Sequence, residues 1–368
     1  MEQIIDECFE KANEVIENCS TENGLFASGG TNGYDAVWSR DSNISFLGAS
    51  LVKNKLFKKT FRKSLVLLGE NQSEKGQIPN CVDKFSERKP HVDFKSIDST
   101  LWFIIGHYIY KSRYRDASLF NKHKNKIKKA LVWLSYQDSS ENKMLEQLPT
   151  TDWQDAFPHK YGYTINSQAL YYKVLMLSKK KEDAKILKKN TNENIDVGLW
   201  ISDFYVPYRW KNHGKYLEIG EWFDSLGNIL AIIFGLADKK QSEKILFYIK
   251  KNKIAEPYPI KAIYPPITEK SKDWQDYYKD CAAGKPNSYL NGGIWTYIGC
   301  FYVCALVKMK QFKEAEEQLE KIANANLRGN FPEWIHPKTK KNFGKLQAWD
   351  AGAYILAYES LKRKKVLL

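Results

Sequence analysis

The chain has 368 residues, 43% of them hydrophobic, which is enough for a large buried core. Its formal net charge of +14 could suit a nucleic-acid or membrane partner. The basic residues are mainly lysines in helix-surface runs such as 179–181 and 362–365, without an RNA-binding motif or zinc-finger spacing. We therefore interpret the charge as a solvated basic surface and expect neither nucleic acid nor a membrane as partner.

The cysteines and the N-terminal segment indicate the compartment. The six cysteines form no CxxC pair, so we expect free thiols in a reducing environment. The segment MEQIIDECFE is acidic and lacks the pattern of a signal peptide. Apolar runs such as 229–234 and 301–307 are too short to span a bilayer. We therefore expect a cytoplasmic protein.

Apolar residues recur at helical spacing from the beginning of the chain, where Ile5, Phe9, Ala12 and Ile16 share one face. The same spacing predicts eleven further helices, at about 41–53, 56–70, 98–112, 117–137, 164–178, 181–189, 223–237, 239–250, 292–309, 312–326 and 346–363. No segment shows sustained alternation with period two, so the predicted fold class is all-α.

The connections between these helices alternate in length. Short links near residues 54, 114, 180, 238 and 311 alternate with long ones at about 19–40, 71–97, 138–163, 190–222, 251–291 and 327–345. Loops longer than about 12–15 residues are uncommon in compact domains and are often functional. In an up-and-down ring of helices, this alternation places all long loops at one end. It predicts an (α/α)6 toroid with one active-site mouth, formed by residues 1–368 as a single domain.

Polar and aromatic residues cluster in or beside these long loops. The clusters are WSRDS (38–42), FKSIDS (94–99), DWQDAF (152–157), IGEWFDS (219–225), DWQDYY (273–278), NSYLNGGIW (287–295), FPEW (331–334) and LQAWD (346–350). Such a composition suits a sugar site, because aromatic rings stack on the apolar face of a pyranose while planar polar groups pair with its hydroxyls. A carbohydrate is therefore the predicted partner.

Hydrolysis of a glycosidic bond needs two carboxyl groups on either side of the anomeric carbon. Spacing alone does not choose among the candidates, which are Asp41, Asp98, Asp152, Asp155, Asp273, Asp276 and Glu333. The two DWQD copies in particular could exchange roles. The motifs GxSxG, HExxH and a phosphate-binding glycine loop are absent and the six histidines are isolated, so we expect neither a metal nor a cofactor.

In their fixed order, the clusters resemble the alkaline/neutral invertases and the amylo-α-1,6-glucosidase domain of glycogen debranching enzymes, from Ala36 to about Glu359. AVWSRDSNISFLGA resembles their Arg-Asp segment, and SIDSTLWFII, WFDSLGNILAI and YLNGGIW resemble motifs of the invertases. YPPI followed by DWQDYY and NSYLNGGIW is especially similar to the debranching-type enzymes. FPEWIHPKTKKNFGKLQAWDAGAYILA resembles the invertase segment in which a Pro-Glu carries the catalytic base.

The resemblance implies roles for individual residues. TDWQDAF followed by YTINSQALYY is similar to the segments that carry the general acid, which assigns this role to Asp155 and the base role to Glu333. Both families invert, so the resemblance implies carboxyl groups about 6.5–9.5 Å apart and a raised pKa for Asp155. The implied substrate contacts are Arg40, Asp41, Asp98, Asn166, Gln168, Asn291, Gly292, Gly293, Trp295, Gln347 and Trp349, with Trp38 and Trp153 as stacking platforms.

Two departures from the invertases weaken an assignment to sucrose. The invertases carry an acidic residue where Asn166 stands, and they lack the DWQDYY loop. We therefore expect an inverting, exo-acting glucosidase for α-glucosides or short oligosaccharides, corresponding only to the glucosidase half of a debranching enzyme. The alternatives are an invertase-like enzyme, an inverting phosphorylase and a sugar-binding toroid without activity. The sequence indicates neither the linkage nor the oligomeric state.

Overall fold

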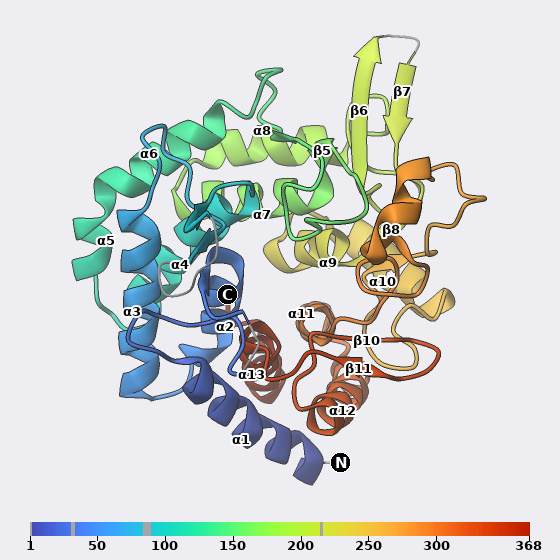
Figure 1. The fold of residues 1–368 in the computed structure, drawn as a ribbon. Coiled ribbons are helices and arrows are strands. Elements are labelled where there is room, and N and C mark those ends of the chain that lie inside the picture. The colour runs from blue at the N-terminus through green and yellow to red at the C-terminus, as the bar shows by residue number, and fades with distance from the viewer. Residues whose placement is uncertain (1, 31–33, 84–89, 214–215) are drawn as a thin grey trace.

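The computed structural model is a ring of paired helices (Figure 1), described for residues 2–30, 34–83, 90–213 and 216–368. Its thirteen α-helices within these residues are α1 (Glu2–Cys19), α2 (Ser39–Ala49), α3 (Lys55–Glu70), α4 (Asp98–Arg113), α5 (Ser118–Lys122), α6 (Lys124–Ser135), α7 (Ile165–Leu177), α8 (Lys181–Asn192), α9 (Ser225–Phe234), α10 (Lys239–Lys251), α11 (Thr296–Lys308), α12 (Phe312–Gly329) and α13 (Ala348–Lys362). The predicted (α/α)6 toroid is confirmed. The predicted helix at 117–137 is divided at His123 into α5 and α6.

Six helices form the inner ring, in which each packs against the next: α2, α4, α7, α9, α11 and α13, which returns to α2. Nearly every residue of an inner helix is buried, as in α9, whereas outer helices such as α12 bury one face only. The contact between α2 and α13 is very close. A Cβ atom on Gly48 would lie 1.9 Å from the carbonyl oxygen of Gly352, so only glycine permits this approach.

The connections from an outer helix to the next inner helix are the long ones, so the inner helices all begin at one end of the ring. This places the first turns of α2, α4, α7, α9, α11 and α13 around one mouth. Helix N-termini carry unpaired N–H groups and a partial positive charge, which favour carboxylates and other oxygen ligands.

Short antiparallel strands lie in these long connections. They are β1 (Val37–Trp38), β2 (Cys81–Val82) and β3 (Val92–Asp93) in one sheet; β4 (Glu146–Gln147), β5 (Gly162–Thr164), β6 (Tyr208–His213) and β7 (Tyr216–Ile219) in a second; and the pairs β8 (Phe223–Asp224) with β9 (Ile263–Tyr264) and β10 (Trp334–Ile335) with β11 (Asn342–Phe343). The hairpin of β6 and β7 projects beyond the ring (Figure 1). Most strands have only two residues, too few for an alternating pattern to be detected.

Some helix boundaries differ from prediction because the loops extend further. The helix predicted from 292 begins at Thr296, because Asn291 and Gly292 bridge back to Ser288 and Gly292 has a φ of +89°. The six cysteines all lie among the described residues, and none of them forms a disulfide there. Across the described part of the chain, no helix combines the length and apolarity required to cross a bilayer.

Candidate active site

A pocket opens at the mouth among the first turns of the inner helices. It has an empty volume of about 430 Å³ and is lined by Tyr34, Trp38, Arg40, Asp41, Trp153, Asp155, Tyr289, Trp295, Glu333, Gln347 and Trp349. These residues come from α2, α13 and the four long connections that precede α2, α7, α11 and α13. Nine of them are residues that the sequence analysis selected.

Asp155 and Glu333 enter this pocket from different connections. The Oε1 atom of Glu333 accepts hydrogen bonds from the hydroxyl of Tyr34 at 3.2 Å and from that of Tyr289 at 3.4 Å. Asp155 belongs to the first DWQD copy. Among the described residues, the second copy contributes nothing to the pocket lining, because Asp273 accepts from the backbone N–H of Glu221 in another part of the chain.

Burial raises the pKa of both carboxyl groups. The pKa of Glu333 rises to about 7, opposed by the hydrogen bonds from Tyr34 and Tyr289 and reinforced by the negative charge of Asp155. The Asp155 side chain keeps solvent-exposed surface, yet loss of hydration is the largest effect on its pKa, which is raised as the sequence analysis expected. Burial also raises the pKa of Asp41 to about 6. The pocket therefore holds three carboxyl groups that gain protons more readily than in water.

Arg40 supplies the positive charge in the pocket wall. Its guanidinium group is buried and binds Asp98 through two hydrogen bonds, Nε to Oδ2 at 2.8 Å and Nη2 to Oδ1 at 3.1 Å. Asp98 is fully buried behind Arg40 and does not line the pocket. Both of its oxygens are occupied, so its place in the structure is to hold Arg40 rather than to face the pocket.

Asn166 and Gln168, both predicted contacts, are buried on α7 outside the pocket lining. Gln168 is engaged by the backbone: its Oε1 accepts from Leu145 N at 2.9 Å and its Nε2 donates to Leu145 O at 2.7 Å. It thereby ties α7 to the segment that precedes β4. Neither amide atom of Asn166 has a hydrogen-bond partner among the described residues.

The predicted contacts Asn291, Gly292 and Gly293 also lie outside the pocket lining. The Asn291 amide bonds to both backbone groups of Ile267 and to Gly284 O, so it shapes the turn. A Cβ atom on Gly293 would lie 2.4 Å from Tyr289 O, so the turn requires glycine there. The turn presents Tyr289 and Trp295, which do line the pocket.

Tyr34 and Tyr289 also line the pocket, although neither was predicted from the sequence. Tyr289 lies within the cluster NSYLNGGIW, so a signal for it existed. Tyr34 has no such signal, since only the tertiary structure brings it to Glu333, 299 residues away.

The floor of the pocket consists of aromatic rings. Trp295 packs edge-to-face against Trp153 and Trp349, with ring centres 5.7 and 5.8 Å apart. The indole N–H groups of Trp153 and Trp349 are buried and have no hydrogen-bond partner in the described part of the chain. Such groups usually bind water or a ligand.

Comparison with known proteins matches two family models. The model described as amylo-alpha-1,6-glucosidase matches residues 11–194, half of the chain. The model described as alkaline and neutral invertase matches residues 218–364.

Two plant enzymes illustrate the sequence similarity. Alkaline/neutral invertase E, chloroplastic, of Arabidopsis thaliana is 28% identical over 172 residues, which cover 43% of this chain and 27% of that protein. Neutral/alkaline invertase 1, mitochondrial, of Oryza sativa subsp. japonica is 30% identical over 139 residues, covering 36% and 22% respectively. The matched regions thus span less than a third of either relative.

Solved structures resemble the whole ring. The GH63 mannosylglycerate hydrolase of Thermus thermophilus superimposes with a TM-score of 0.70 at 13% identity, covering 96% of this chain and 100% of that one. The rhamnosidase of Klebsiella oxytoca gives a TM-score of 0.69 at 14% identity, covering 98% and 64%. At these identities the likeness concerns the fold alone.

Proposed function

The chain belongs to the amylo-α-1,6-glucosidase family of glycoside hydrolases, and from this premise we propose that it is an inverting, exo-acting glucosidase for α-glucosides or short oligosaccharides. We propose further that residues 1–368 act as one catalytic domain. The observation that carries the proposal is the entry of Asp155 and Glu333 into one aromatic-floored pocket from different connections. Hydrolysis of a glycosidic bond by this mechanism requires two carboxyl groups at the sugar site.

In the proposed mechanism, Asp155 donates a proton to the glycosidic oxygen as the bond from that oxygen to the anomeric carbon breaks. Glu333 takes a proton from a water molecule whose oxygen bonds to the anomeric carbon from the other face. The electrostatics support these roles, because burial favours a proton on the carboxyl group of Asp155, and burial together with the negative charge of Asp155 raises the pKa of Glu333.

The remaining pocket residues support binding of a terminal sugar. Trp153, Trp295 and Trp349 close the floor, which favours a chain end over an internal unit. Arg40 and Asp41 supply charged hydrogen-bonding groups at the wall. A sugar hydroxyl near the indole N–H of Trp153 or Trp349 would satisfy a buried donor.

Sucrose hydrolysis is the second candidate, because residues 218–364 match the alkaline and neutral invertase model. The discriminating assay offers sucrose, isomaltose, maltose, trehalose and a limit dextrin to the wild type, Asp155→Asn and Glu333→Gln, and follows the first anomer released by NMR. We expect hydrolysis of an α-glucoside with release of β-glucose, lost in both variants.

Other outcomes of this assay would contradict the proposal. Activity on sucrose alone would favour the invertase candidate, and release of the attacked glucosyl unit as α-glucose would exclude inversion. A requirement for inorganic phosphate would favour a phosphorylase. Binding of sugar without cleavage would indicate a sugar-binding toroid.

A further inference from the structure

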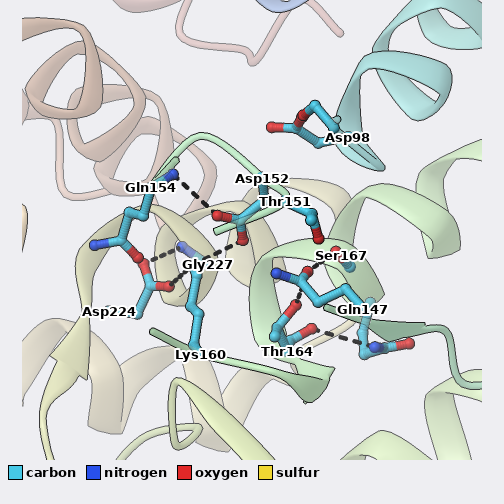
Figure 2. Close-up of polar contacts among 12 residues, drawn as sticks. Asp98, Gln147, Thr151, Asp152, Gln154, Lys160, Thr164, Ser167, Asp224 and Gly227 are labelled. Atoms are coloured by element: carbon cyan, nitrogen blue, oxygen red, sulfur yellow. Dashed lines mark hydrogen bonds and ion pairs between the residues drawn. The ribbon is translucent and has the colours of Figure 1, made fainter. Parts of the chain in front are cut away.

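The connection that carries Asp155 contains a buried lysine. Lys160 is completely buried, and its Nζ atom lies 2.9 Å from Asp152 Oδ2 and 2.8 Å from Asp224 Oδ2. Figure 2 shows the amine between the two carboxyl groups, which are themselves completely buried. Together the three side chains carry one net negative charge when ionised.

The ion cluster lies on the side of the connection away from the pocket. Along the segment 152–155 the side chains alternate, because Trp153 and Asp155 line the pocket whereas Asp152 and Gln154 are buried elsewhere. Asp152 also accepts a hydrogen bond from the backbone N–H of Gln154 at 2.9 Å. The direction in which Asp155 points is therefore coupled to the position of Asp152.

Lys160 and Asp152 flank Asp155 in the sequence, so their ion pair closes the segment 152–160 at its base. The second contact of Lys160 fastens this base to the inner ring, since Asp224 is the N-cap of α9 and accepts from Gly227 N at 3.1 Å. At the other side, the backbone N–H of Ile97 donates to Thr151 O at 2.7 Å, immediately before α4. The loop is thus held at two inner helices.

Stability alone does not account for this arrangement. Removing a lysine from water is costly, and well-packed neutral side chains often stabilise a core as well as a buried ion pair does. In some proteins a buried ion pair instead serves to fix one conformation of the chain. Here the ion pair between Lys160 and Asp152 lies in the segment that carries the proposed acid.

We propose that Lys160 is a positioning residue for the general acid. It closes the segment 152–160 and fastens it to the N-terminus of α9, and so determines where the carboxyl group of Asp155 meets the substrate. Asp152, held by the same amine, keeps a negative charge behind that carboxyl group. The inference rests on the proposed function only in the role it gives to Asp155.

The charges around Asp155 have opposing effects on its pKa. Arg40 lowers it, whereas Asp98 and Asp152 raise it. The other charged or titratable groups of the pocket are Asp41, Glu333, Tyr34 and Tyr289. Removing the charge of Asp98 would deprive the buried Arg40 of its ion pair, whereas without the charge of Asp152 the amine of Lys160 still has Asp224. Asp152 is therefore the better site for this perturbation.

The first experiment replaces the whole cluster by neutral groups of similar size, in the triple variant Asp152→Asn, Lys160→Met, Asp224→Asn. This avoids leaving two unpaired buried carboxylates, and asparagine can still cap α9. We expect a folded protein in which kcat falls about 10- to 100-fold while KM changes little, since the acid is misplaced rather than removed. Hydrogen exchange of the segment 152–160 should accelerate, while exchange of the inner helices is retained.

The second experiment compares Asp152→Asn with its matched control, Asp224→Asn. Each variant leaves a one-to-one ion pair with Lys160 and removes one negative charge, but only Asp152 belongs to the segment of Asp155. We expect Asp152→Asn to lower the pKa of the alkaline limb of kcat/KM by about one unit, because the protonated acid loses a stabilising negative neighbour. Asp224→Asn should move that limb less.

Hydrogen exchange and a ¹³C titration of the Asp155 carboxyl group require no activity, so they separate this inference from the proposed function. Unchanged hydrolysis in Asp155→Asn would refute the acid assignment, while the exchange and titration data would still decide whether Lys160 holds the segment. A folded triple variant with wild-type kcat and wild-type exchange of 152–160 would overturn the positioning role. Equal shifts of the Asp155 titration in Asp152→Asn and Asp224→Asn would overturn the role of Asp152.

Discussion

The two tyrosines on Glu333 make the ionisation of the proposed base open to direct test. Burial raises the pKa of Glu333 to about 7, and the hydroxyls of Tyr289 and Tyr34 oppose this rise by donating to Oε1. The base must be ionised, so activity is gained as the pH rises through this pKa. Replacing Tyr289 by Phe removes one donor and should therefore shift the acidic limb of the pH–rate profile to higher pH.

The size of the shift follows from the geometry. A hydrogen bond to an ionised group contributes about 1.5–3 kcal/mol, and one pKa unit corresponds to about 1.4 kcal/mol. The bond from Tyr289 is long, at 3.4 Å, so we expect less than the full effect, about 0.5–1 unit. Tyr34→Phe should act in the same direction.

The assay is kcat/KM on the best substrate over the range of pH in which the protein stays folded, because this ratio reports the pKa values of the free enzyme. Tyr277→Phe is the control, since Tyr277 contacts His159 outside the pocket lining. An acidic limb that stays in place or moves to lower pH in Tyr289→Phe, with the limb of Tyr277→Phe unchanged, would refute the assignment of Glu333 as base.

Other perturbations of the site and the core have equally definite outcomes. Glu333→Gln should raise the melting temperature by a few degrees at pH 8 and by less at pH 5. The raised pKa means that the ionised carboxyl group, which predominates at pH 8, destabilises the folded state. Equal gains in melting temperature at both pH values would contradict this. Arg40→Lys should lower the free energy of unfolding, measured by urea denaturation, by about 3 kcal/mol or more, because lysine cannot replace both bonds to Asp98. A loss below about 1 kcal/mol would show that stability does not require the two-bond contact. His107 and His123 have pKa values lowered by burial to about 3 and about 4, so both are neutral in the folded protein. Stability should therefore decline as the pH falls below about 6.5, the pKa of histidine in the unfolded chain. In His107→Gln, the difference between the melting temperatures at pH 8 and pH 5 should be smaller than in the wild type.

The helical ring could be predicted from the sequence because its signals are local. Apolar spacing identifies each helix, and the alternation of short and long connections is a property of the linear chain. The same local signals fail within the long connections. Strands of two residues, such as β1 and β2, show no pattern, and they form because segments that are distant in the sequence pair with each other.

The residue types of the candidate site could be predicted from the sequence, but the directions in which their side chains point could not. Clusters of carboxylates and aromatic residues identified most of the pocket wall, including Asp155 and Glu333. The same clusters contain Asn291, whose amide turns to the backbone of its own loop. Residue type alone does not distinguish these two uses of a polar side chain.

The sequence by itself therefore determined the fold class, the position of the mouth and the segments that reach it, because helix periodicity and loop length need no long-range information. Only the tertiary structure decided which side chains face the pocket. Tyr34 reaches Glu333 across 299 residues, and Lys160 reaches Asp224 across 64. Lysine is rarely buried, so its role could emerge only from the two carboxyl groups that the fold brings to it.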